Sequence, residues 1–248
     1  MKKCFKCLLT GLLVGVAVLA TCYAASDITK QYKYPDLTWK SKDSRGNVIV
    51  NVHFAAREIT QATDINIMEG YPDGTFRPDD PVKRCEFIKM LIGLATNRTF
   101  DFGSINSSYN TWYGPYVTVA EMQEIIGKNQ YTEKELDEPI TRLEMILMLA
   151  KTQIKMKGIP QSQLGKLVYT DIGDLTQDEK DLVLHAAQYD LLEGMKDGSI
   201  TLLEPHKNLT RGEAAAALMR IYWCTKDFFS VQKNLEKNIR IWMCRGKF

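Results

Sequence analysis

The sequence predicts a mostly α-helical domain made of three divergent helix–loop–helix units. The same order of turn and helix signals recurs three times along the chain. The second helix of each unit begins with a Thr-x-x-Glu motif or a variant of it, and apolar residues then recur at helical spacing. A two-helix unit is too small to enclose a core by itself, so we expect the three units to form one cooperative domain in which the second helices pack against each other.

The first 25 residues are expected to be a secretory signal peptide. Three lysines within the first six residues precede an uncharged apolar run, Leu8 to Ala20, that ends in small residues. This order is typical of secretory leaders. Two alternatives stay open, namely an uncleaved N-terminal anchor and lipidation of Cys22, whose preceding residues resemble a lipobox except for a Thr before the cysteine.

The charge of the chain argues against a nucleic-acid partner. The whole chain has 32 Lys and Arg against 30 Asp and Glu. Three of the lysines lie in the leader, so the remainder is close to neutral. A general nucleic-acid-binding protein would carry a basic surface.

The cysteines and histidines predict no metal site and no cofactor. Half of the six cysteines lie in or beside the leader. Cys85 falls within a helical pattern and is expected to pack as a small apolar residue, whereas Cys224 and Cys244 could pair. No Cys-x-x-Cys follows the leader and the three histidines are far apart in sequence, so a zinc site is not expected.

The unit boundaries follow from the repeated signals. They are 1–25 for the leader, 26–98, 99–158 and 159–223 for the three units, and 224–248 for a C-terminal tail that mixes apolar with basic residues.

The first unit carries the clearest turn. Residues 70–76 read Gly-Tyr-Pro-Asp-Gly-Thr-Phe, in which Gly supplies a positive φ and Asp bonds its own backbone. The unit begins with a Tyr-Pro-Asp-Leu tetrad and contains an insertion from Trp39 to Val52. Lys83 occupies the position where the other units have a capping Thr, so we expect the following helix to have the weakest N-terminus of the three.

The second helices of the other two units are expected to begin with capping boxes, Thr141 with Glu144 and Thr210 with Glu213. In this motif the Thr hydroxyl accepts from a backbone N–H of the first turn, and the Glu carboxylate accepts from the backbone N–H of the Thr.

An arginine directly follows the capping position in every unit, as Arg84, Arg142 and Arg211. Neither capping nor core packing requires arginine there. One interpretation is a solvated charge or an ion pair with a neighbouring unit. The other is an anion site, in which the guanidinium is combined with free backbone donors of the helix N-terminus.

These motifs resemble a known repeat. The Gly-Tyr-Pro-Asp-Gly-Thr-Phe-x-Pro turn, followed by a Thr-Arg-Ala-Glu-like tetrad, is similar to the S-layer homology repeat, which occurs in threes. Leu143 and Gly212 replace Ala in the second and third tetrads, and Lys83 and Cys85 replace Thr and Ala in the first. The resemblance covers roughly residues 34–222.

The resemblance implies a fold and a ligand. The fold would be a pseudo-threefold arrangement in which the second helices form a central bundle and grooves lie between the units. The ligand would be a secondary cell-wall polysaccharide that often bears a pyruvate ketal, and Arg84, Arg142 and Arg211 would hold its carboxylate.

Further site residues are implied by position, and each has a structural alternative. Asp36, Asp171 and Trp112 would line the sugar-facing walls, although the aspartates could instead cap or turn the chain and Trp112 could belong to the core. Glu86, Glu144 and Glu213 are candidate contacts as well as capping groups. Ser104 stands where the second unit should have Asp, so only one or two grooves are expected to bind.

The expected function is non-catalytic attachment of an exported protein to the bacterial cell wall or cell surface. The alternative is an assembly module whose degenerate grooves, or whose tail, contact another envelope protein. An enzyme is disfavoured, because no motif pairs a nucleophile with a base and no phosphate-binding loop or metal-ligand cluster occurs.

Overall fold

The computed structural model describes residues 31–96, 100–157, 169–192, 194–197 and 200–224. The leader, the tail after Cys224 and the predicted pairing of Cys224 with Cys244 lie outside the described residues. We call the described parts unit 1 (31–96), unit 2 (100–157) and unit 3 (169–224).

The described residues are mainly helical. Unit 1 contains the 3₁₀ helix η1 (Pro35–Leu37), strands β1 (Thr38–Lys42) and β2 (Val48–Val52), and helices α2 (Ala56–Asp64) and α3 (Arg84–Ala95). Unit 2 contains η2 (Phe102–Ser104), α4 (Gly114–Met122), α5 (Glu133–Leu136) and α6 (Arg142–Lys157). Unit 3 contains α7 (Gln177–Gln188), β3 (Met195–Asp197), β4 (Ile200–Leu202) and α8 (Arg211–Cys224).

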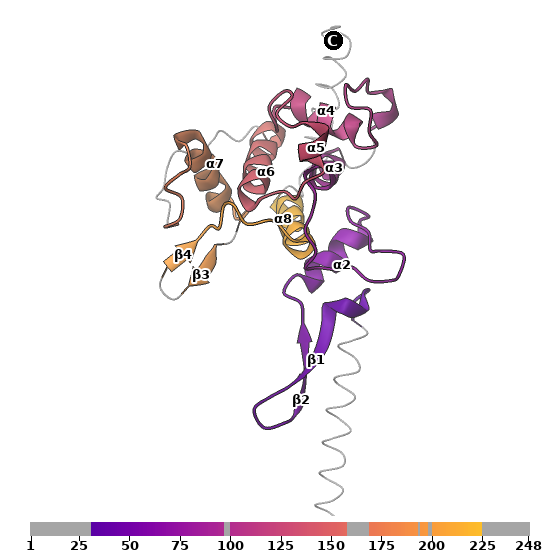
Figure 1. Ribbon diagram of the computed structural model, residues 1–248, viewed down its shortest axis with the longest axis vertical. Coiled ribbons are helices and arrows are strands. Elements are labelled where there is room, and N and C mark those ends of the chain that lie inside the picture. Colours follow the sequence, from indigo (N-terminus) through magenta and orange to yellow (C-terminus); the bar gives the residue numbers. More distant parts are fainter. Residues whose placement is uncertain (1–30, 97–99, 158–168, 193, 198–199, 225–248) are drawn as a thin grey trace, which may run out of the picture.

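The first long helix of each unit packs on the last helix of another unit. Helix α2 packs on α8, α4 packs on α3, and α7 packs on α6, while α3 also contacts α6 and α8 (Figure 1). Each last helix was expected to bury one face against the other last helices. The structure adds a covering helix from another unit to each of them, namely α4 on α3, α7 on α6 and α2 on α8.

The segments that precede the three last helices form a closed ring of hydrogen bonds. The backbone N–H of Val82 donates to the carbonyl of Leu209 over 3.0 Å. The N–H of Leu209 donates to the carbonyl of Ile140, and the N–H of Ile140 donates to the carbonyl of Val82, both over 2.9 Å. All three side chains are fully buried. Each of these backbone amides therefore depends on a neighbouring unit for its partner.

The insertion between Trp39 and Val52 is a β-hairpin, which was not predicted. Strand β1 pairs antiparallel with β2, with Thr38 opposite Val52. The turn is held by the Asp43 carboxylate, which accepts from the backbone N–H groups of Arg45 and Asn47, both over 2.8 Å. The hairpin projects away from the helices (Figure 1).

Two local predictions are confirmed. Gly74 has a φ of +84° in the predicted turn, and the Asp73 carboxylate accepts from the N–H of Thr75 over 2.9 Å. Cys85 is fully buried, and its burial, together with the nearby carboxylate of Asp137, raises the pKa of the thiol to about 11.

A buried histidine between α6 and α7 should make stability depend on pH. His185 is fully buried, with its Nε2 atom 2.9 Å from Oε1 of Gln153, and burial lowers the pKa of His185. As the pH falls, the unfolded chain is protonated first, at about 6.5. The contribution of the buried neutral His185 to the free energy of unfolding is therefore complete above that pH. It is lost as the pH falls below it, with a slope of at most about 1.4 kcal/mol per pH unit.

Urea unfolding at pH 7.5 and 5.5 measures this effect. We expect the free energy of unfolding to fall at pH 5.5, and the His185→Gln variant to lose part of that fall. If both proteins respond equally to pH, His185 is not its source.

Candidate functional site

The three predicted arginines occupy equivalent places, and each reaches into another unit. They are the first residues of α3, α6 and α8. The backbone N–H of Arg84 donates to the carbonyl of Glu138, that of Arg142 to Lys207, and that of Arg211 to Asp80, over 2.8 to 3.0 Å.

The anion-site interpretation needs free backbone donors, and at α6 and α8 the first two backbone N–H groups are not free. The next amides of α6 and α8, those of Leu143 and Gly212, donate to Pro205 and Pro78 of other units. The inter-unit contacts use the donors that an anion would have needed. An anion site at the start of α6 or α8 would therefore depend on the guanidinium group.

Arg84 is neutralised by unit 2. Its Nε donates to Oε1 of Glu144 over 2.8 Å, and its Nη1 donates to the carbonyl of Glu135 over 2.9 Å. The same Glu144 oxygen accepts from the hydroxyl of Tyr131 over 3.0 Å. Burial alone would lower the pKa of Arg84, but the hydrogen bond and charge of Glu144 raise it. This guanidinium is committed to an internal ion pair.

Arg142 forms a buried link between units 2 and 3. Only 6% of this residue is exposed. Its Nε donates to the carbonyl of Leu203 over 3.0 Å, and its Nη1 lies 3.4 Å from Oε1 of Glu213. A large ligand has no access to a side chain that is covered to this extent.

Arg211 differs from both, because it forms no ion pair with any residue that the structure describes. Its Nε donates to the carbonyl of Phe76 over 2.9 Å, and its Nη2 donates to the carbonyl of Glu69 over 2.7 Å. The guanidinium lies 4.9 Å from the ring centre of Tyr71 and 4.6 Å from that of Phe76. The side chain is partly exposed. Its positive charge is therefore available at the boundary between units 3 and 1, beside two aromatic rings.

The predicted glutamates cap their helices. Glu144 and Glu213 each accept from the backbone N–H of the preceding Thr, over 2.8 and 2.9 Å, which confirms both capping boxes. The second oxygen of each carboxylate holds the arginine of the unit before. Glu86 accepts from the N–H of Lys83 over 3.1 Å, but it forms no ion pair with Arg211.

The predicted aspartates hold the backbone of a loop in their own unit. The Asp36 carboxylate accepts from the N–H groups of residues 76 and 77, and Asp171 accepts from those of residues 203 and 204, over 2.6 to 3.0 Å. These loops supply the carbonyls that receive Arg211 and Arg142, so the aspartates position the arginine sites indirectly. Ser104, at the corresponding place in unit 2, instead donates to the carbonyl of Asp101.

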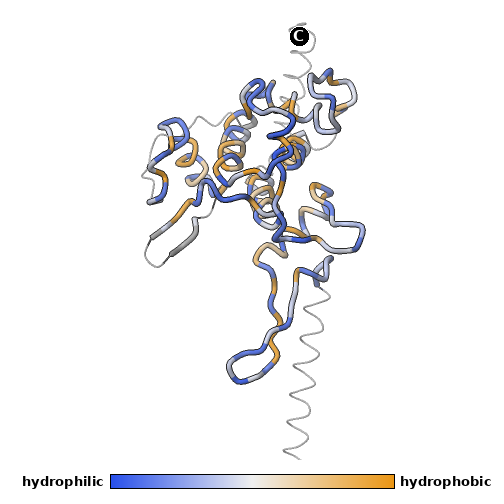
Figure 2. The backbone as a smooth tube through the Cα atoms, viewed as in Figure 1, coloured by the Kyte–Doolittle hydropathy of each residue, from blue (hydrophilic) through white to orange (hydrophobic). Residues whose placement is uncertain are grey.

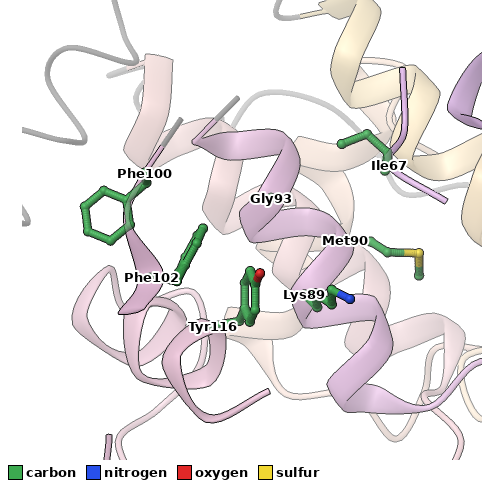
Figure 3. Close-up of a pocket in the computed structure, with 7 residues that line it drawn as sticks. All are labelled: Ile67, Lys89, Met90, Gly93, Phe100, Phe102 and Tyr116. Atoms are coloured by element: carbon green, nitrogen blue, oxygen red, sulfur yellow. The ribbon is translucent and has the colours of Figure 1, made fainter. Parts of the chain in front are cut away.

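Trp112 is not a core residue, because 58% of it is exposed. Its ring lies 5.0 Å from the ammonium group of Lys89 on α3. Lys89 also lines a cavity of about 240 Å³ between α3, η2 and α4, whose wall contains the stacked rings of Phe102 and Tyr116 (Figure 3). None of the predicted arginines lines this cavity, so the structure does not bring Trp112 and the arginines together there.

Sequence reasoning missed the aromatic residues that surround the arginines. Tyr71 and Phe76 lie in the predicted turn, where only the Asp and Gly residues were interpreted. Their place in a motif shared with a binding repeat was the available signal. Tyr131 gave no such signal, because it precedes the short helix α5 in a polar stretch.

The replacement of Ala by Gly212 has a steric cause. A Cβ atom on residue 212 would lie 2.6 Å from Cε1 of His53, which is nearly buried. The hairpin is followed directly by His53, so the glycine allows the end of the hairpin to approach α8.

Among the described residues, no group of His, Cys, Asp and Glu is arranged to hold a metal ion. In the same part of the chain, no helix is long and apolar enough to cross a membrane.

Comparison with known proteins identifies one domain. Residues 49–88 match the S-layer homology domain, a module that anchors surface proteins to the cell wall. This segment runs from β2 to the first turn of α3 and contains Tyr71, Phe76 and Arg84.

Similar proteins are much longer than this chain. It is 26% identical over 160 residues to an amylopullulanase of Thermoanaerobacterium thermosulfurigenes. The aligned residues cover 62% of this chain and 8% of the amylopullulanase. It is 40% identical over 48 residues to cell surface glycoprotein 1 of Acetivibrio thermocellus, covering 19% of this chain and 2% of that protein. An endoglucanase of a Bacillus species is 26% identical over 164 residues, which cover 63% of this chain and 16% of the endoglucanase. The S-layer homology region itself is non-catalytic, so the enzyme names say nothing of catalysis here.

Proposed function

We propose that this chain attaches non-covalently to the bacterial cell wall by binding an acidic glycan at the boundary between units 3 and 1. The observation that carries the proposal is Arg211, whose charge no described carboxylate neutralises. The match of residues 49–88 to a wall-anchoring module supports the same function.

We further propose that the three units are divergent S-layer homology repeats in a pseudo-threefold arrangement. Support comes from the closed ring through Val82, Ile140 and Leu209, and from the equivalent places of the three arginines. In this arrangement each boundary would be a potential groove. Two of them contain a motif arginine that is already paired with a glutamate, whereas Arg211 at the third has no ion pair among the described residues.

The ligand that fits this site is a secondary wall polysaccharide with a carboxylate, such as a pyruvate ketal. Arg211 uses two of its five N–H donors for the carbonyls of Phe76 and Glu69. The remaining donors can hold a carboxylate in a charge-assisted contact. The ring of Tyr71 lies beside the guanidinium of Arg77, at 4.0 Å, as well as that of Arg211, so a second positive charge is close to the proposed carboxylate position.

Cosedimentation of the exported chain with purified wall material tests the proposal. We expect Arg211→Gln to weaken binding by about tenfold or more, because charge-assisted contacts contribute roughly 1.5–3 kcal/mol. Arg57→Gln is the matched control, since it removes the same charge from an exposed position on α2. Wall material freed of its ketal groups should bind wild type as weakly as Arg211→Gln binds intact walls. Equal binding by folded Arg211→Gln and wild type would contradict the proposed site.

A second candidate function is an assembly module that contacts another envelope protein. The internal pairing of Arg84 and Arg142 favours it, because at these two boundaries the motif arginine already holds a glutamate of the chain itself. This alternative predicts that removal of the ketal groups leaves cosedimentation unchanged.

A further inference from the structure

The β1–β2 hairpin exposes apolar side chains that the proposed glycan site does not use. The exposed fractions are 51% for Trp39, 62% for Val48, 45% for Ile49 and 36% for Val52. Trp39 and Ile49 lie on one face of the hairpin, whereas Val48 and Val52 lie on the other, because side chains alternate along a strand. Figure 2 shows the hairpin standing clear of the helices that enclose the core. A two-stranded hairpin of this kind is marginally stable unless further strands or a packing surface support it.

The outer edge of β2 lacks the features that prevent pairing with another strand. Its sequence, Val-Ile-Val-Asn-Val, contains no charge and no proline, and it is paired only with β1 among the described residues. Natural edge strands are usually protected by lysine, proline or a bulge. Strand β1 has Lys40 and Lys42, so its edge is protected and that of β2 is not.

The register of the hairpin directs the backbone N–H and C=O groups of three valines toward the open edge. The N–H of His53 donates to the carbonyl of Leu37, and that of Asp43 donates to Asn47, so these pairs are hydrogen-bonded. Hydrogen-bonded and non-hydrogen-bonded pairs alternate in an antiparallel ladder. The backbone groups of Val48, Val50 and Val52 therefore point away from β1 and have no strand partner in the described part of the chain.

We propose that β2 pairs with the β2 strand of a second copy of this chain, antiparallel and centred on Val50. In this register Val50 lies opposite Val50 of the partner subunit, and Val48 lies opposite Val52 of the partner subunit. Charge selects this edge, because β2 brings no charges together, whereas the same pairing of β1 would place Lys40 opposite Lys40 of the partner subunit. The product is a four-stranded sheet with a continuous row of valines on one face.

The size of the interface predicts a weak dimer. Two five-residue strands bury less than the roughly 1,200–2,000 Å² of a standard stable interface. We therefore expect dimers at high protein concentration and on surfaces where many copies are held close together. The inference concerns the hairpin alone and stands whether or not Arg211 binds a glycan.

Cysteine cross-linking tests the register. Facing residues in a hydrogen-bonded antiparallel pair have Cα atoms about 5.5 Å apart, which suits a disulfide. In a chain with Cys4, Cys7, Cys22, Cys224 and Cys244 replaced by Ser, Val50→Cys should give a covalent dimer on mild oxidation. Val48→Cys is the matched control, because the two copies of residue 48 would lie about 13 Å apart. It should cross-link only when mixed with Val52→Cys. Failure of Val50→Cys to cross-link, or equal cross-linking by Val48→Cys alone, would overturn the proposal.

Sedimentation equilibrium provides a readout without cysteines. Val50→Lys would place two ammonium groups opposite each other and should weaken the dimer by about tenfold or more. Ser44→Lys adds the same charge in the exposed turn and should leave the association unchanged. A wild-type chain that stays monomeric at millimolar concentration, or that uses the hairpin to bind phosphatidylglycerol vesicles instead, would also overturn the proposal.

Discussion

Replacement of Arg142 by alanine is expected to lower the free energy of unfolding by about 3 kcal/mol, the lower end of the range for breaking a buried ion pair. The guanidinium is nearly buried, and it links the carbonyl of Leu203 to the carboxylate of Glu213 across the boundary of two units. Removing it leaves the largely buried Glu213 carboxylate with only the more exposed ammonium group of Lys207, 3.6 Å away, as its cation. The capping bond of Glu213 to Thr210 survives, but it does not neutralise the charge.

Urea unfolding followed by circular dichroism measures this loss. Arg57→Ala is the control, because this exposed arginine should change stability by no more than about 0.5 kcal/mol. The double variant Arg142→Leu with Glu213→Leu should be less destabilised than Arg142→Ala, since no buried charge is then left unpaired. A single variant within about 1 kcal/mol of wild type would argue against a buried inter-unit ion pair.

The features that were predicted correctly from the sequence are those whose interacting residues lie within a few positions of each other. Capping boxes join positions three apart, and the turn at Gly74 depends on its own φ and on the neighbouring Asp73. Such geometry is fixed by residue type and spacing alone. The burial of Cys85 follows equally from its place in a helical pattern.

The partners of the arginines could not be predicted in this way, because they are distant in sequence. Arg84 and Glu144 are separated by 60 residues, and Arg211 and Glu69 by 142. The local motif is nearly the same for all three arginines, yet two are neutralised and one is not. That difference depends on which groups of another unit reach the guanidinium. For Arg211 these are two backbone carbonyls and two aromatic rings of unit 1, and the carboxylate of Glu86 is not among them.

The hairpin was missed although the sequence contains a signal for it. Residues 38 and 39 are the β-prone Thr and Trp, and residues 48–52 are rich in valine and isoleucine, with Asp43 and Gly46 between the two runs. Two β-prone runs around an Asp- and Gly-containing turn indicate a hairpin. The repeat pattern drew attention to the helices, and this segment was interpreted only as an insertion.

A chain that ends at residue 157 is expected to lose cooperative folding. It would retain units 1 and 2 but lack α8, on which α2 packs, and α7, which covers α6. Ile59 and Ala62 of α2 are fully buried in the complete chain. The truncation would also remove the acceptor of the Val82 amide and open the hydrogen-bonded ring. The free energy of unfolding of natural domains is only about 5–15 kcal/mol. The loss of two helix–helix contacts and of the acceptor for the Val82 amide should therefore cost more than the whole free energy of unfolding.

Thermal unfolding of the truncated and complete chains distinguishes a shared core from independent units. If the units fold on their own, the truncated chain should show a sigmoidal transition with fixed aromatic circular dichroism. We expect instead a broad change without a heat-capacity peak, because α2 of unit 1 packs on α8 and α6 of unit 2 is covered by α7, and both partners belong to unit 3. The Arg211 site requires this closure as well, since its guanidinium comes from unit 3 and its carbonyl acceptors come from unit 1. Loss of wall binding in the truncated chain would thus follow from the same broken boundary that abolishes its folding.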